Sequence, residues 1–288
     1  MENNEIQVIE PEKVEVIQVD SVEALMAQTR SEIDVQIATA KQYPRNLSQV
    51  LNNIETLATM DEETASSCFY MLRRQGKLIE GASVRMAEII ASSWGNIRVQ
   101  SRIIGNDGKM ITAQGVCHDL ESNYAVSAEV KRRITDKNGR TFSDDMQVVT
   151  GNAACAIAMR NALFKVVPMA LVKKVINKAK KVSLGEATSL EETRTKMLNY
   201  FQTIGVDQQH LFDYLSVEKI DEIDTDMCVE LRGLATAIKE GTTTVQETFF
   251  PKPETKEATQ EEVDPSKDLF GNEATPEKTK RGRKGGDK

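Results

Sequence analysis

The residues best suited to chemistry in this sequence are arginines and lysines concentrated in the middle of the chain. Residues 71–181 contain 19 Lys and Arg against 9 Asp and Glu, whereas residues 1–70 contain 4 against 13 and residues 182–288 contain 14 against 22. The net charge of −7 therefore conceals a basic segment between two acidic flanks. Clustered guanidinium and ammonium groups attract phosphates and release counterions on binding. The pattern thus indicates a polyanionic partner for the middle segment.

The candidate phosphate contacts come from two expected strands and two expected helices. Arg98 and Arg102 are four positions apart in a strand, so their side chains project from the same face. A second strand ends in three consecutive basic residues, and the helices on either side of Pro168 carry the others. The complete set of predicted phosphate contacts is Arg98, Arg102, Lys131, Arg132, Arg133, Arg160, Lys165, Lys173 and Lys174.

Other chemistries find less support in the sequence. The four cysteines are far apart in the sequence, without a Cys-x-x-Cys pair, and the chain has 2 histidines. This pattern argues against a zinc site and against a disulfide framework, and it is typical of a protein in a reducing cytoplasm. There is no Gly-x4-Gly-Lys-Ser/Thr loop for a nucleotide. Asp144 and Asp145, with Asp119, could hold a metal for nuclease chemistry, but an acidic first turn of a helix explains the pair more simply. We therefore expect no catalysis, no cofactor and no metal.

Hydrophobic periodicity and turn residues predict an α+β fold. The opening is expected to be entirely helical. Asn106-Asp107-Gly108 and Glu121-Ser122-Asn123 then separate three strands of an antiparallel meander, and a turn over residues 136–139 closes it. A long helix with a broad apolar stripe follows and ends at Pro168. The fold class is thus helices flanking a three-stranded meander, a long helix, and a small C-terminal helical module. The expected helices cover residues 20–43, 47–60, 61–76, 83–93, 144–167, 170–181, 193–204, 208–215 and 226–239, and the expected strands cover residues 97–104, 110–120 and 124–134.

Composition divides the chain into four regions. Residues 1–19 are expected to be a disordered acidic tail, and residues 242–288 a second tail rich in Pro, Glu, Lys, Thr and Gly. Residues 20–182 form the predicted α+β domain, which contains the basic segment, and residues 183–241 the small acidic helical module. No apolar run approaches the roughly 20 residues of a membrane span, and the N-terminus lacks the order of a signal peptide. We expect a soluble cytoplasmic protein without a membrane partner.

The segment ACAIAMRNALFKVVPMALVKKVINKA (Ala154–Ala179) resembles the phage single-strand annealing proteins of the RecT, Redβ and Erf group. In that group an Ala-rich helix carries Arg, then Leu-Phe-Lys and then Pro, matched here by Arg160, residues 163–165 and Pro168. The resemblance covers about residues 60–182 and does not extend residue by residue into the meander. It implies ATP-independent binding of single-stranded DNA and annealing of complementary strands by a homo-oligomeric ring or filament. It also implies that the acidic C-terminal module recruits a replication or exonuclease protein.

Two alternatives to an annealing protein remain open at the level of sequence. The first is a non-enzymatic structural or regulatory interaction protein whose basic patch binds an acidic protein partner. The second is the metal-dependent nuclease built on the three aspartates named above. Faster pairing of complementary oligonucleotides without ATP supports the annealing protein. Absence of DNA binding at every salt concentration favours the first alternative, and Mg²⁺-dependent loss of substrate that Asp145→Ala abolishes would identify the second.

The first prediction concerns the basic helix after Pro168. Neutralising Lys173 and Lys174 together should weaken binding of single-stranded DNA and lower the slope of log K against log salt by about one to two units, because each phosphate contact releases a counterion. Oligonucleotide titrations across a salt series measure this slope. An unchanged slope would show that neither lysine contacts a phosphate.

Overall fold

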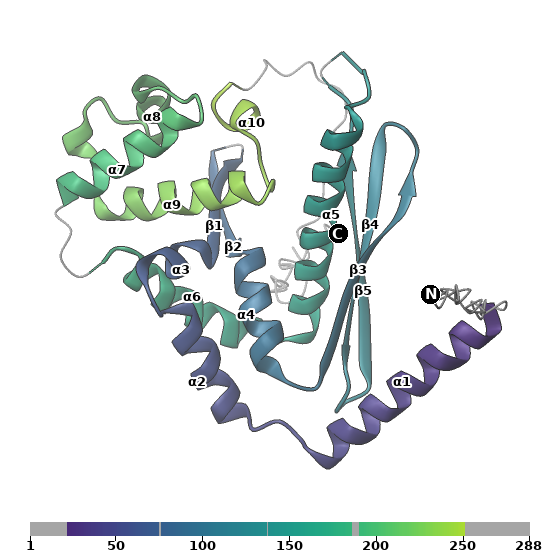
Figure 1. Ribbon diagram of the computed structural model, residues 1–288. Helices are drawn as coiled ribbons and strands as arrows, with labels where there is room; N and C mark the ends of the chain where they lie inside the picture. Colours follow the sequence, from purple (N-terminus) through teal and green to yellow (C-terminus); the bar gives the residue numbers. More distant parts are fainter. Residues whose placement is uncertain (1–21, 75, 137, 186–189, 251–288) are drawn as a thin grey trace, which may run out of the picture. The chain divides into compact units, whose positions relative to one another are not determined.

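A computed structural model describes residues 22–250, apart from Gln75, Lys137 and residues 186–189. It confirms the predicted α+β fold, in which helices accompany a three-stranded antiparallel meander and a long helix follows the meander (Figure 1). The predicted tail over residues 1–19 lies outside the described residues, as does the part of the second tail from residue 251 onward.

Four helices and a short hairpin precede the meander. Asn46, Asp61 and Ser83 precede α2, α3 and α4, and each side chain accepts a hydrogen bond from a backbone N–H in the first turn of its helix. Such caps satisfy donors that have no partner within the helix. These elements are α1 (Val22–Gln42), α2 (Leu47–Ala58), α3 (Glu62–Ser67), β1 (Phe69–Arg74), β2 (Lys77–Ala82) and α4 (Val84–Trp94).

The expectation of a single helix over residues 61–76 is wrong. Helix α3 ends at Ser67, and the chain continues as the antiparallel hairpin β1–β2. Phe69 and Tyr70 open β1, where aromatic side chains suit a pleated surface, and Gly76 adopts a φ of 73° in the turn. The apolar residues of this segment fit a helical spacing as well as a strand, so hydrophobicity alone did not distinguish the two.

The meander forms a second sheet in the order β3 (Ile97–Asn106), β4 (Met110–Asp119) and β5 (Tyr124–Arg133). Every second residue of the central strand β4 is buried, from Ile111 to Asp119. This alternation defines an inner face that packs against the protein and an outer face with the opposite set of side chains.

Helix α5 (Asp144–Val166) covers the inner face of this sheet (Figure 1). Small residues at Gly151, Ala154 and Ala158 allow the helix to approach closely, and Gly115 of β4 lies directly beneath the backbone of Ala158. After Pro168 the chain bends by 119° into α6 (Met169–Ser183). Within the described residues no single helix has the length and apolar character to cross a membrane, and α5 with α6 meets that test as a bent pair.

The C-terminal helices pack on the β1–β2 hairpin. Leu72 belongs to the same apolar core as Phe201 and Leu234, and Arg73 forms a bidentate ion pair with Glu230 at 2.5 and 2.9 Å. The described residues on both sides of the expected boundary at residue 183 thus belong to one compact unit. The helices are α7 (Leu190–Thr203), α8 (Gln208–Leu215), the 3-10 helix η1 (Ile220–Glu222), α9 (Thr225–Lys239) and α10 (Val245–Phe249).

The start of the second predicted tail needs a correction, because residues 242–250 are ordered. Thr244 and Glu247 form a reciprocal capping box at the start of α10, and Phe249 is buried against the C-terminal core. The capping box and the aromatic residue outweigh the polar composition that suggested disorder.

The second prediction tests the contact between α5 and the sheet. A Cβ on Gly115 would lie 2.1 Å from the carbonyl oxygen of Ala158, so Gly115→Ala must displace the helix backbone. We expect a loss of about 3 kcal/mol in the free energy of unfolding, measured by urea denaturation. Gly105→Ala is the matched control, because the nearest atom to its Cβ is a Thr112 side-chain carbon at 3.8 Å. Equal stabilities of the two variants would contradict the packing.

Candidate nucleic-acid interface

The outer face of the meander gathers four of the predicted phosphate contacts. Because Val99 pairs with the buried Cys117 of the inner face, its neighbour Arg98 projects outward together with Arg102. On β5, Lys131 pairs with Thr112 and Arg133 pairs with Met110, which places both on the outer face as well. The register therefore brings together residues from the two outer strands of the sheet.

These four cations form two rows on either side of β4. Adjacent strands are about 4.8 Å apart, so the row on β3 and the row on β5 are separated by about 10 Å. The hydrogen bonds that the structure shows for the β3 row go to neutral amides: Arg98 donates to Gln36 of α1 at 3.4 Å and Arg102 donates to Gln114 of β4 at 3.2 Å.

The charge of the outer face is not balanced within the described part of the chain. Glu129 is the one acidic side chain at its strand positions. No ion pair between described residues involves any of the four cations. We call this surface, defined by Arg98, Arg102, Gln114, Glu129, Lys131 and Arg133, the basic sheet face.

Arg132 does not belong to the basic sheet face. It pairs with Ile111, whose side chain is buried on the inner face, so Arg132 projects toward α5. Its Nη2 would lie 3.4 Å from a Cβ on Gly241, in the loop after α9. The period of two along a strand separates Arg132 from its neighbours, and this signal is already present in the sequence.

Arg160 is also directed into the protein, contrary to the expectation of a surface contact. Its side chain is buried, with Nη1 3.8 Å from Oε2 of Glu240 and the guanidinium 5.0 Å from the centre of the Tyr70 ring. Glu240 in turn accepts hydrogen bonds from the backbone of Val84 and Arg85 at the start of α4. Arg160 therefore connects α5 with α4, β1 and the end of α9.

The remaining predicted contacts lie on α5 and α6. Lys165, Lys173 and Lys174 are exposed around the bend at Pro168. Helix α6 packs against α2, α3 and the β1–β2 hairpin, and two other lysines of this helix pair with Glu55 and Glu80. The three exposed lysines thus form a group of their own, on elements other than the strands of the basic sheet face.

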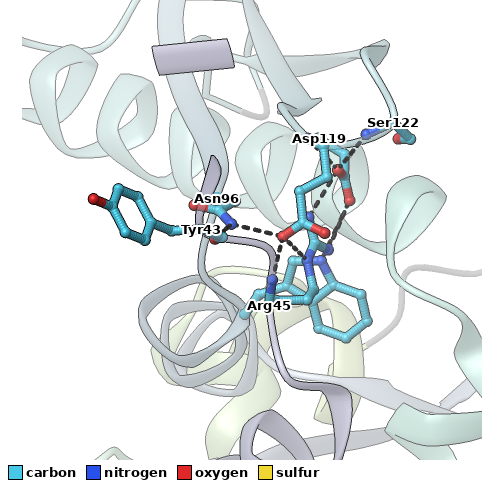
Figure 2. A network of polar contacts seen from close by, with 7 residues as sticks. Tyr43, Arg45, Asn96, Asp119 and Ser122 are labelled. Carbon is cyan, nitrogen blue, oxygen red and sulfur yellow. Dashed lines mark hydrogen bonds and ion pairs between the residues drawn. The ribbon is translucent and has the colours of Figure 1, made fainter. Parts of the chain in front are cut away.

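A polar network fixes one end of the meander (Figure 2). Arg45 binds Asp119 through Nη1 at 2.7 Å and Nη2 at 2.8 Å, and it donates from Nε to Glu121 at 2.9 Å. Burial opposes ionisation of Glu121, but hydrogen bonds from Asn96 and Arg45 outweigh it and hold the pKa of Glu121 below its ordinary value. Asn96 also donates to the backbone carbonyl of Tyr43 at 2.8 Å, so the network ties the end of α1 to the β4–β5 turn.

The three aspartates of the nuclease alternative are not brought together. Asp119 lies in the polar network at one end of β4, whereas the N-terminal part of α5 packs near Ile111 at the other end, about 27 Å along the strand. Asp144 and Asp145 are exposed in the first turn of α5. No group of three His, Cys, Asp or Glu among the described residues is arranged to hold a metal ion.

One further cation was missed by sequence reasoning. Lys109 is exposed in the β3–β4 turn, and its carbonyl oxygen accepts a hydrogen bond from the N–H of Ile134 at 2.8 Å. This bond places Lys109 beside the end of β5, next to Arg133. The antiparallel register of β4 with β5 is the signal that could have found it.

Comparison of the chain with protein-family models, with curated proteins and with solved structures finds no match. The resemblance of Ala154–Ala179 to annealing proteins therefore stays a prediction from the sequence. Within that segment, Ala154, Ala158 and Leu163 are buried in the packing of α5.

The third prediction concerns Glu240. Burial raises the pKa of its carboxyl group above the ordinary value, although hydrogen bonds from the backbone of α4 and the charge of Arg160 oppose the shift. A carboxyl with a raised pKa contributes most to stability while protonated, and this contribution is lost as the pH rises through the raised pKa. Glu240→Gln resembles the protonated form at every pH. We expect the wild type to lose stability relative to this variant as the pH rises above about 4.3. Urea denaturation from pH 4 to 7.5 measures the difference, and a constant difference would contradict the assignment.

Proposed function

We propose that this protein binds single-stranded DNA and anneals complementary strands without ATP. The observation that carries the proposal is the basic sheet face, where four cations and one carboxylate line a surface that the ion pairs between described residues leave unbalanced. The resemblance of Ala154–Ala179 to the RecT, Redβ and Erf group supports the same function.

The side chains of the basic sheet face suit contact with the phosphate backbone. Its strand positions carry no Phe, Tyr or Trp on which a base could stack, whereas arginine and lysine bind phosphate in any sequence context. A strand held by its phosphates keeps its base edges free for pairing. Annealing needs this arrangement, because the complementary strand must reach those edges.

The wider setting follows from the same proposal. The protein acts by binding rather than by catalysis and requires no cofactor. It works in the cytoplasm as a homo-oligomer, in a ring or a filament, so that several sheet faces hold one strand. The acidic C-terminal helices recruit a replication or exonuclease protein.

A strand-annealing assay tests the proposal directly. Two complementary labelled oligonucleotides are mixed with the protein in EDTA without ATP, and pairing is followed by fluorescence energy transfer. We expect faster pairing than in buffer alone, and an affinity for the oligonucleotide that rises as the salt concentration falls. No binding at any salt concentration would contradict the proposal and favour an acidic protein as the partner of the basic surface.

The fourth prediction assigns the phosphate contacts. The triple variant Arg102→Gln, Lys131→Gln and Arg133→Gln should lower the slope of log K against log salt by about two, since single-stranded DNA contributes about 0.7 per phosphate contact. The side chains are exposed, so the fold should be unaffected.

The matched control neutralises three exposed lysines of the C-terminal helices and their loops, Lys196, Lys219 and Lys239. It changes the net charge by the same amount and should leave the slope near the wild-type value. An equal decrease of the slope in the two variants would show a general effect of charge and would contradict the assignment of the phosphate contacts to the sheet face.

A further inference from the structure

Residues 1–21 carry a charge opposite to that of the basic sheet face. They contain six carboxylates, at Glu2, Glu5, Glu10, Glu12, Glu15 and Asp20, against the single Lys13. Two of the four cations of the sheet face, Arg98 and Arg102, donate to neutral amides, and the carboxylate at the strand positions of this face is Glu129. The segment and the basic sheet face are thus opposite in charge, and both belong to the same chain.

The chain connects this segment to the basic sheet face through α1. Gln36 of α1 accepts the hydrogen bond from Arg98, so the C-terminal half of the helix contacts the edge of that face. Burial then decreases along one side of the helix toward its N-terminal end: Ala40 is 1% exposed, whereas Leu25 and Met26 are 61% and 66% exposed. Residues 1–21 are therefore attached to the exposed, N-terminal end of α1.

The length of the segment is sufficient to return to the sheet. Val22 is 14 residues before Gln36, which corresponds to about 21 Å along the helix. Twenty-one residues can span up to about 70 Å when extended. A strand of ten residues is about 34 Å long, so the segment can run back along α1 and still cover the basic sheet face.

We propose that residues 1–21 occupy the basic sheet face in the absence of nucleic acid and compete with it for the same cations. The competition depends on the proposed DNA-binding function, whereas the occupancy itself does not. A tethered segment acts at an effective concentration of about a millimolar, so weak contacts suffice. A DNA strand long enough to contact both rows of cations displaces the segment, while shorter polyanions bind poorly.

The first experiment detects the occupancy without DNA. A benzophenone amino acid replaces the exposed Ser127 on the outer face of β5, and after irradiation of the full chain the cross-linked peptides are identified by mass spectrometry. We expect cross-links to residues 1–21. The matched control places the same group at Asn152, exposed on α5, and should give none.

Three outcomes of the cross-linking experiment would contradict the occupancy. A mixture of isotopically heavy and light protein separates cross-links within one chain from those between copies. Cross-links to residues 252–288, cross-links only between copies, or no cross-link from position 127 would each overturn the proposal.

The second experiment measures the competition. Glu→Gln at positions 2, 5, 10, 12 and 15 with Asp20→Asn should tighten binding of a labelled oligonucleotide by about tenfold at 50 mM salt, and the gain should disappear at high salt. The control removes six carboxylates from residues 254–268, namely Glu254, Glu257, Glu261, Glu262, Asp264 and Asp268. An equal gain in the control, or none in the test variant, would overturn the competition. If neither variant nor the wild type binds DNA, the proposed function fails, and the cross-linking result decides the occupancy on its own.

Discussion

The close approach of α5 to the meander is the constraint on which the rest of the structure depends. Gly115 lies under the backbone of Ala158, with no room for a Cβ, and at the other end of the contact a Cβ on Gly151 would lie 3.2 Å from the Cδ1 atom of Ile111. Small residues at these positions bring helix and sheet together, and the dispersion energy of such close packing stabilises both. The contact also decides which face of the sheet is inner and which remains for function.

Once the inner face is fixed, the period of two along each strand determines what the outer face presents. Arg102, Lys131 and Arg133 are outward because Ile103, Val130 and Arg132 are inward.

The segment that resembles annealing proteins also takes part in the contact between helix and sheet. Its alanines pack α5 onto the sheet and its proline sets the bend into α6, so most of the shared pattern describes packing. The surface that would touch DNA lies in the meander, outside the shared segment.

Local sequence signals predicted the elements whose formation depends on neighbouring residues, namely the meander and the long helix. Turn residues separated the three strands, and the apolar stripe and Pro168 defined the long helix, in agreement with the structure. The β1–β2 hairpin was missed because its apolar spacing fits a helix equally well. Arg160 was misplaced because its partner Glu240 is 80 residues away, a contact that no local pattern contains. Arg132, in contrast, was predictable from strand alternation.

The central claim is that the basic sheet face holds single-stranded DNA. Photochemical cross-linking of an oligonucleotide that carries aryl azide groups on its phosphate backbone to the full chain, with mass-spectrometric mapping of the attached peptides, tests it most directly. The account predicts attachment within β3 and β5, around Arg98–Arg102 and Lys131–Arg133. Attachment confined to α6 or to the C-terminal helices would contradict it and move the interface away from the sheet.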